Sequence, residues 1–84
     1  MEEKLEKVRH SIEPILNEKE IIVDSVQYVF ENNYYFLRIV LDKLNGIDLD
    51  TIVEATNLIN PLLDELDLFE ESYILDVLSK EKNV

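Results

Sequence analysis

The sequence predicts an α+β fold, a two-layer α/β sandwich with two helices on one face of a three-stranded sheet. Two segments carry apolar residues at helical spacing, and three are β-branched or alternate as strands do. Their order along the chain is α-β-β-α-β. With 84 residues, the chain has room for one domain with one hydrophobic core. We expect that single domain to span residues 1–84, with residues 79–84 as a frayed polar tail.

The first helix is expected over residues 2–17. Leu5, Val8, Ile12 and Leu16 recur there at helical spacing, with charged residues between them. Pro14 lies in the last turns and removes one backbone hydrogen bond. A kink or an early end of the helix is therefore expected near this residue.

A β-hairpin is expected next, with strands over residues 20–31 and 34–42. The two apolar runs flank Asn32-Asn33, and Asn tolerates the positive φ angles of a tight hairpin turn. Alternation places Leu37, Ile39 and Leu41 on one face of the second strand. On the first strand, the more apolar face is expected to contain Ile22, Val26, Tyr28 and Phe30.

The second helix is expected over residues 48–66, and the third strand over residues 72–78. Gly46 lies in the turn before the helix, Asp48 is a plausible N-cap, and Pro61 predicts a bend. The pattern leaves the order of the strands in the sheet open. Buried side chains are predicted at Leu5, Val8, Ile12, Leu37, Ile39, Ile52, Ile59, Leu63, Leu75 and Val77.

Net charge excludes some classes of function. The chain has 19 acidic and 8 basic residues, a formal charge of −11, which repels phosphate backbones and argues against direct binding of nucleic acid. It has no Cys, which fits a reducing compartment, and no apolar run long enough for a signal peptide or a membrane span. We therefore expect a cytoplasmic protein that does not bind membranes.

The acidic residues are unevenly placed, because residues 44–79 contain no Lys or Arg. Carboxylates at the end of the second helix also face the negative end of its dipole, where local stability disfavours them. Both features favour a cationic protein partner, although acidity can also serve solubility alone. The predicted partner-binding acidic surface contains Asp48, Asp50, Asp64, Glu65, Asp67, Glu70 and Glu71.

The outer face of the sheet is a second candidate surface, since two helices cover only one face. Val23, Phe36, Val40 and Ile74 are expected to make it half-apolar, and an exposed apolar patch commonly marks an interaction site. Weak homodimerisation through this face is therefore a competing prediction.

Catalytic and metal-binding patterns are absent from the sequence. His10 is the only His, and no Ser lies in a G-x-S-x-G context. One Gly cannot build a phosphate-binding loop, and Asp48-x-Asp50 lacks the remainder of a calcium loop. We expect no enzyme activity, no cofactor and no metal, and we interpret His10 as a solvent-exposed helical residue.

Several segments, in order, resemble the N-terminal domain of the ribosome maturation factor RimP family. The resemblance covers the chain from about Leu5 to Val77, and its order of elements is also α-β-β-α-β. The segments that carry it are Ile12-Glu13-Pro14-Ile15-Leu16, Leu37-Arg38-Ile39-Val40-Leu41-Asp42, Gly46-Ile47-Asp48-Leu49-Asp50, Leu62-Leu63-Asp64 and Tyr73-Ile74-Leu75-Asp76-Val77.

The resemblance implies a non-catalytic role in assembly of the small (30S) ribosomal subunit. The acidic domain would contact a basic small-subunit ribosomal protein or the assembling subunit itself. The family continues with an S-S-P-G-x-x-R-P-L segment and a second, SH3-like domain, where this sequence has Ser79 to Val84. We therefore expect the N-terminal domain alone. The alternative is a self-associating adaptor with no ribosomal role.

Overall fold

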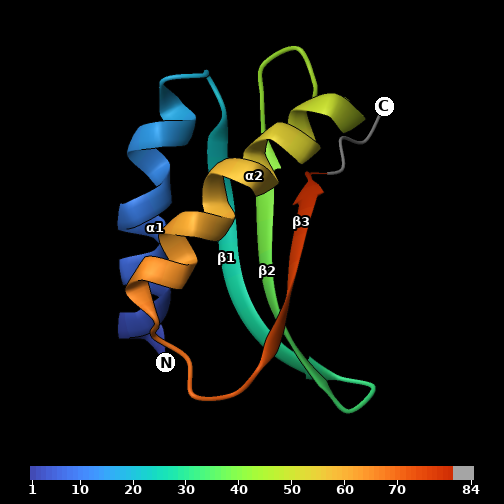
Figure 1. Ribbon diagram of the computed structural model, residues 1–84. Coiled ribbons are helices and arrows are strands. Elements are labelled where there is room, and N and C mark those ends of the chain that lie inside the picture. The colour runs from blue at the N-terminus through green and yellow to red at the C-terminus, as the bar shows by residue number, and fades with distance from the viewer. Residues whose placement is uncertain (81–84) are drawn as a thin grey trace.

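A computed structural model describes residues 1–80 of the protein. The order of elements is α1 (Glu2–Asn17), β1 (Ile22–Glu31), β2 (Tyr34–Asp42), α2 (Leu49–Leu66) and β3 (Tyr73–Ser79). The strands form one sheet in the order β1-β2-β3, and the helices lie on one of its faces (Figure 1). This confirms the predicted α+β fold.

The sheet is mixed. β1 and β2 form an antiparallel hairpin, whereas β3 lies parallel to β2. The parallel pairing requires the chain to cross over, and α2 makes that connection. The hairpin turn has the predicted geometry, because Asn32 and Asn33 adopt φ angles of 51° and 68°, both in the left-handed region.

A β-bulge at Asp24 changes which residues of β1 face the helices. Val23 pairs with Leu41 and Ser25 with Val40, so Asp24 is the extra residue between these pairs. Because side chains alternate, one extra residue reverses the facing of the segment before it. Val23 is therefore buried, at 3% exposure, and Ile22 is 55% exposed. The predictions that Val23 lies on the outer face and Ile22 on the inner face are both wrong.

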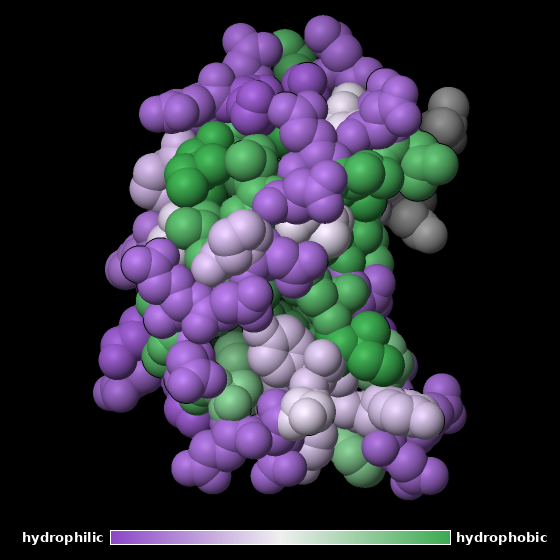
Figure 2. Space-filling view, viewed as in Figure 1, coloured by the Kyte–Doolittle hydropathy of each residue, from purple (hydrophilic) through white to green (hydrophobic). Residues whose placement is uncertain are grey.

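The core lies between the inner face of the sheet and the helices. Six of the predicted core residues are buried, namely Val8, Ile12, Leu37, Ile39, Ile59 and Leu63. Four pack half-buried around them, namely Leu5, Ile52, Leu75 and Val77. In Figure 2, polar side chains predominate on the outer surface of the helices, and apolar side chains show between them and toward β3.

Neither proline ends its helix. α1 continues past Pro14 to Asn17, and α2 continues past Pro61 to Leu66. Of the two outcomes predicted near Pro14, a kink or an early end of the helix, the early end does not occur. Each proline removes one hydrogen bond, and burial of the apolar stripe on each helix outweighs that loss. The predicted N-cap is confirmed, because Asp48 accepts a hydrogen bond of 2.8 Å from the Thr51 N–H.

The sequence predicts a frayed tail from residue 79, but Ser79 is part of β3. Lys80 follows it in an ordered position, where its N–H donates to the Leu41 carbonyl at 2.7 Å and its Nζ donates to Asp24 at 3.0 Å. Residues 81–84 of the predicted tail lie outside the described residues.

Candidate protein-binding surface

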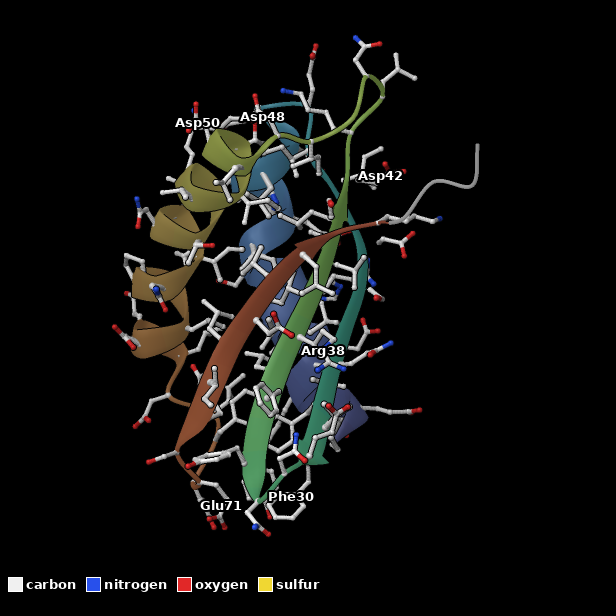
Figure 3. The ribbon with its side chains drawn as sticks, turned by 90° about the vertical axis from the view of Figure 1, so that its right-hand side faces the viewer. Phe30, Arg38, Asp42, Asp48, Asp50 and Glu71 are labelled. Carbon is white, nitrogen blue, oxygen red and sulfur yellow. The ribbon has the colours of Figure 1, made fainter. Side chains whose placement is uncertain are left out.

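The predicted acidic residues fall into two groups at opposite ends of α2. Asp48 and Asp50 lie at the start of the helix, and the remaining carboxylates lie near its end and in the loop before β3 (Figure 3). At 1.5 Å per residue, about 24 Å of helix separates Asp48 from Asp64. The second group, here called the acidic end surface, consists of Asp64, Glu65, Asp67, Glu70 and Glu71.

Asp48 has a structural role at its own end of α2. The Thr51 hydroxyl donates to its carboxylate at 2.6 Å, and the Thr51 N–H donates at 2.8 Å. These two hydrogen bonds, the hydroxyl first, lower the pKa of Asp48 below its usual value. Its role as the helix N-cap therefore explains why an Asp occupies position 48, and no binding partner is needed to account for it.

Part of the acidic end surface lines an open hollow between α2 and β3. Its volume is about 430 Å³, and Asp64, Glu70 and Glu71 contribute to its lining together with Tyr73 and Leu75. A second hollow of about 570 Å³ lies beyond the loop and shares Glu71 and Tyr73 with the first. The carboxylates thus lie beside concave surface that a partner can enter.

Stacked aromatic rings hold the acidic loop in place. The ring of Phe69, in that loop, lies 4.6 Å from the ring of Tyr28 on β1 and 5.4 Å from that of Tyr73 on β3. Tyr35 on β2 extends the stack, with its ring 5.2 Å from Tyr28. Such pairs stabilise beyond the area they bury. The loop that carries Glu70 and Glu71 is therefore anchored to all three strands.

Carboxylates of the acidic end surface lie close enough to two tyrosines to affect their ionisation. Burial raises the pKa of Tyr73 first, and the negative charges of Asp64 and Asp67 raise it further. Burial likewise raises the pKa of Tyr28, with Glu71 among the further causes. The carboxylates therefore act on the aromatic residues beneath them.

No salt bridge within residues 1–80 involves a carboxylate of the acidic end surface. Elsewhere in this part of the chain, acidic side chains do pair, as Glu54 does with Lys19 at 2.8 Å and Asp24 with Lys80 at 3.0 Å. The nearest aromatic–cation contact is Lys4, whose Nζ lies 5.8 Å from the Phe69 ring centre. Most of the charge of this surface is thus available to an external cation.

Asp67 ends α2 in a left-handed conformation, with φ 45° and ψ 53°. Its N–H donates to the Leu63 carbonyl at 3.0 Å. Gly or Asn is usual at this position, and a negative charge there opposes the helix dipole. Local stability therefore does not explain an Asp at this residue.

The outer face of the sheet retains three of its four predicted residues. Phe36 and Val40 are half-buried, and Ile74 is 45% exposed. Sequence reasoning missed Val29 and Leu78, which the register places beside Phe36 and Val40. Strict alternation from Ile74 could have found Leu78.

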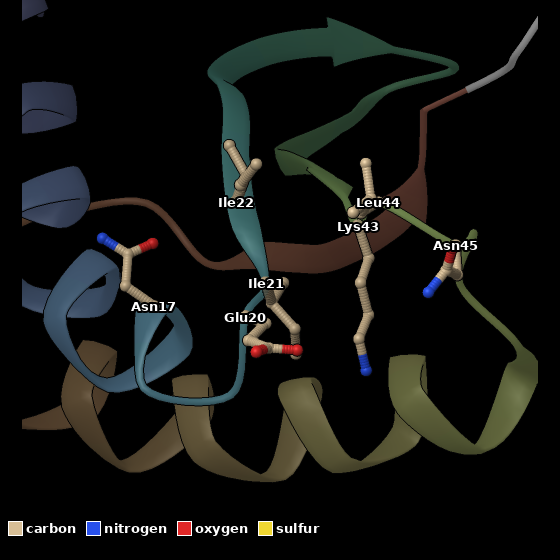
Figure 4. A pocket seen from close by; sticks show the side chains of 7 residues that line it. All are labelled: Asn17, Glu20, Ile21, Ile22, Lys43, Leu44 and Asn45. Carbon is tan, nitrogen blue, oxygen red and sulfur yellow. The ribbon is translucent and has the colours of Figure 1, made fainter.

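A third hollow, of about 500 Å³, lies between the turn after α1 and the turn after β2 (Figure 4). Ile21, Ile22 and Leu44 line it with Lys43 and other polar residues, and Leu44 is 88% exposed. The sequence indicated nothing at this position.

A family model described as the RimP N-terminal domain matches residues 11–80. The chain belongs to the RimP N-terminal domain family. As a member, it has a role in ribosome maturation, and the RimP family is a family of non-enzymatic maturation factors. The segment of this RimP domain that resembles L-R-[VI]-x-[IL]-D is β2, which contributes Leu37, Ile39 and Leu41 to the core.

One prediction for a single residue of this RimP domain is also confirmed. His10 is exposed on α1, where its Nε2 lies 3.7 Å from a Glu6 oxygen. Within residues 1–80, no helix is both long and apolar enough to cross a membrane.

Proposed function

We propose that this domain assists assembly of the small ribosomal subunit in the cytoplasm by binding a Lys/Arg-rich ribosomal protein at the acidic end surface. The observation that carries the proposal is the group of carboxylates that form no salt bridge with any of residues 1–80, three of which line a hollow with an anchored aromatic lining. Membership of a ribosome maturation family supports the ribosomal context.

Electrostatics determines how such a surface would act. Exposed ion pairs contribute about 1 kcal/mol or less each, so affinity requires several acting together. Their larger effect is on the rate of association, which falls as salt screens the field. The same field repels RNA phosphates, so a protein is the favoured partner within the subunit.

The test is a triple variant, Asp64→Asn, Asp67→Asn and Glu70→Gln, assayed for association with purified basic proteins of the small subunit. We expect association to slow by about tenfold or more at low salt, with a flatter salt dependence. A matched control, Glu18→Gln, Glu20→Gln and Asp50→Asn, removes the same charge from the opposite end of the molecule. Equal rates and salt slopes for the two variants would assign the acidity to solubility alone.

A second candidate function is self-association through the outer face of the sheet. It is favoured by the row of Val29, Phe36 and Ile74, whose apolar side chains lie side by side on three strands. Sedimentation velocity distinguishes the two candidates, because a dimer held by apolar contacts persists at high salt, whereas acidic docking does not.

A further inference from the structure

The two edges of the sheet differ in their protection. At the β1 edge, α1 packs alongside, and Arg9 donates hydrogen bonds to the carbonyls of Val23 at 2.8 Å and Asp24 at 3.3 Å. The bulge at Asp24 interrupts the same edge. A bulge and a covering helix are devices by which proteins prevent pairing with another strand.

The β3 edge has no comparable protection within residues 1–80. β3 pairs with β2 on one side only, and its sequence contains no Pro, Gly, Lys or Arg. Its one charged residue, Asp76, is bonded to Arg38 on the neighbouring strand at 3.0 Å. An unprotected edge of seven residues is long enough to accept another strand.

The pairing of β3 shows which main-chain groups face outward. The Lys80 N–H donates to Leu41 on β2, and main-chain groups alternate between the two sides of a strand. The N–H and C=O groups of Tyr73, Leu75, Val77 and Ser79 therefore point away from β2. In the described part of the chain, no hydrogen bond from another element reaches them.

Charge indicates what fits this edge. Glu70 and Glu71 lie one residue short of β3, Asp64 lies across the adjoining hollow, and residues 44–79 include no cation. A second copy of the chain would bring a further charge of −11 and the same carboxylates to the edge. A basic segment meets complementary charge instead.

We infer that the free edge of β3 accepts an extended, Lys/Arg-rich peptide segment as a fourth strand. Its main chain pairs with residues 73, 75, 77 and 79, and its cations lie beside Asp64, Glu70 and Glu71. Main-chain bonds supply affinity in this mode, and side chains supply specificity. The inference rests on the proposed function for the basic character of the partner, and adds how that partner binds.

The experiment uses the ¹⁵N-labelled full chain and a peptide of alternating Lys and Val. A second peptide of the same sequence is N-methylated at every residue, which keeps the charge and removes all main-chain donors. We expect the first peptide to slow hydrogen exchange at the amides of Leu75, Val77 and Ser79. The methylated peptide should bind about tenfold or more weakly, because it cannot form a strand ladder.

A variant pair gives an independent measurement. Val77→Pro removes an outward N–H and blocks the edge, whereas Val77→Ala loses similar apolar contact and keeps the N–H. Only the Pro variant should lose affinity for the first peptide. The peptide comparison needs no mutation, so it decides the matter even if Val77→Pro does not fold.

The remaining outcomes separate the inference from the proposed function. Equal binding of both peptides without amide protection overturns strand addition and leaves electrostatic docking intact. If neither peptide binds at low salt, strand addition and the proposed electrostatic docking are both overturned. If the same amides are protected from hydrogen exchange without any peptide, and the protection rises with protein concentration, a second copy of the chain occupies the edge. That result overturns the inference.

Discussion

Arg38 Nε donates a hydrogen bond of 3.0 Å to Asp76 Oδ2, which joins β2 to β3 on the outer face of the sheet. The same guanidinium contacts Glu31 at 3.3 Å, and these two carboxylates, Glu31 first, raise the pKa of Arg38. The pair lies between two apolar rows, Val29–Phe36–Ile74 and Val40–Leu78. It therefore keeps the outer face from becoming one continuous apolar patch.

Replacing both partners, Arg38→Leu with Asp76→Leu, should promote self-association. The net charge is unchanged, and the two apolar rows become continuous. We expect the dimer to tighten by about tenfold or more in sedimentation velocity. Adding Ile74→Asp should reverse the effect, and a strict monomer at about millimolar concentration would contradict the prediction.

The titration of Tyr73 reports the field of the acidic end surface. Asp64→Asn with Asp67→Asn should lower the pKa of Tyr73, because two negative charges that disfavour the phenolate are removed. Burial is the larger cause, so the pKa should stay above the ordinary value of 10.0. Ultraviolet titration measures the change. An unchanged pKa would mean that these carboxylates do not act on Tyr73.

Asp48 predicts a specific dependence of stability on pH. Its pKa is lower in the folded state than its ordinary value of 3.8, so its stabilisation is present above that value and is lost as pH falls through the folded pKa. Asp48→Ala should therefore be less stable than the parent at neutral pH, and the difference should narrow in acid. Asp48→Asn keeps a hydrogen-bond acceptor that does not titrate. The difference in stability between this variant and Asp48→Ala should therefore depend less on pH than that between the parent and Asp48→Ala. Urea unfolding at about pH 7 and about pH 3 tests both variants.

Glu20 is a position where substitution should stabilise the fold. It adopts φ 63°, a left-handed conformation that disfavours residues with a Cβ atom. Glu20→Gly should raise the free energy of unfolding by about 0.5–1 kcal/mol, since relief of strain exceeds the entropy cost of glycine. Glu20→Ala removes the same charge and keeps the strain, so it should give no such gain in chemical denaturation.

Local patterns in the sequence were sufficient to predict the helices and strands. Helical spacing of Val8 and Ile12, alternation of Leu37 and Ile39, and the turn at Asn32-Asn33 each depend on residues close in the chain. The prediction of which β1 side chains face the core was wrong for the residues before Ser25. A bulge reverses their facing, and a bulge depends on how two strands pair, which is not a local property.

Residue patterns alone were enough to predict the class of fold, the order of elements, the N-cap at Asp48 and the excess of acidic charge after Lys43. Assembly of the sheet places β3 parallel to β2, and among residues 1–80 nothing pairs with its outer edge. The tertiary structure also separated Asp48 and Asp50 from the acidic end surface and gathered the latter around Tyr73. The physical reason is that helix and strand propensities act over a few residues, whereas strand order and the meeting of distant side chains depend on burial of one shared core.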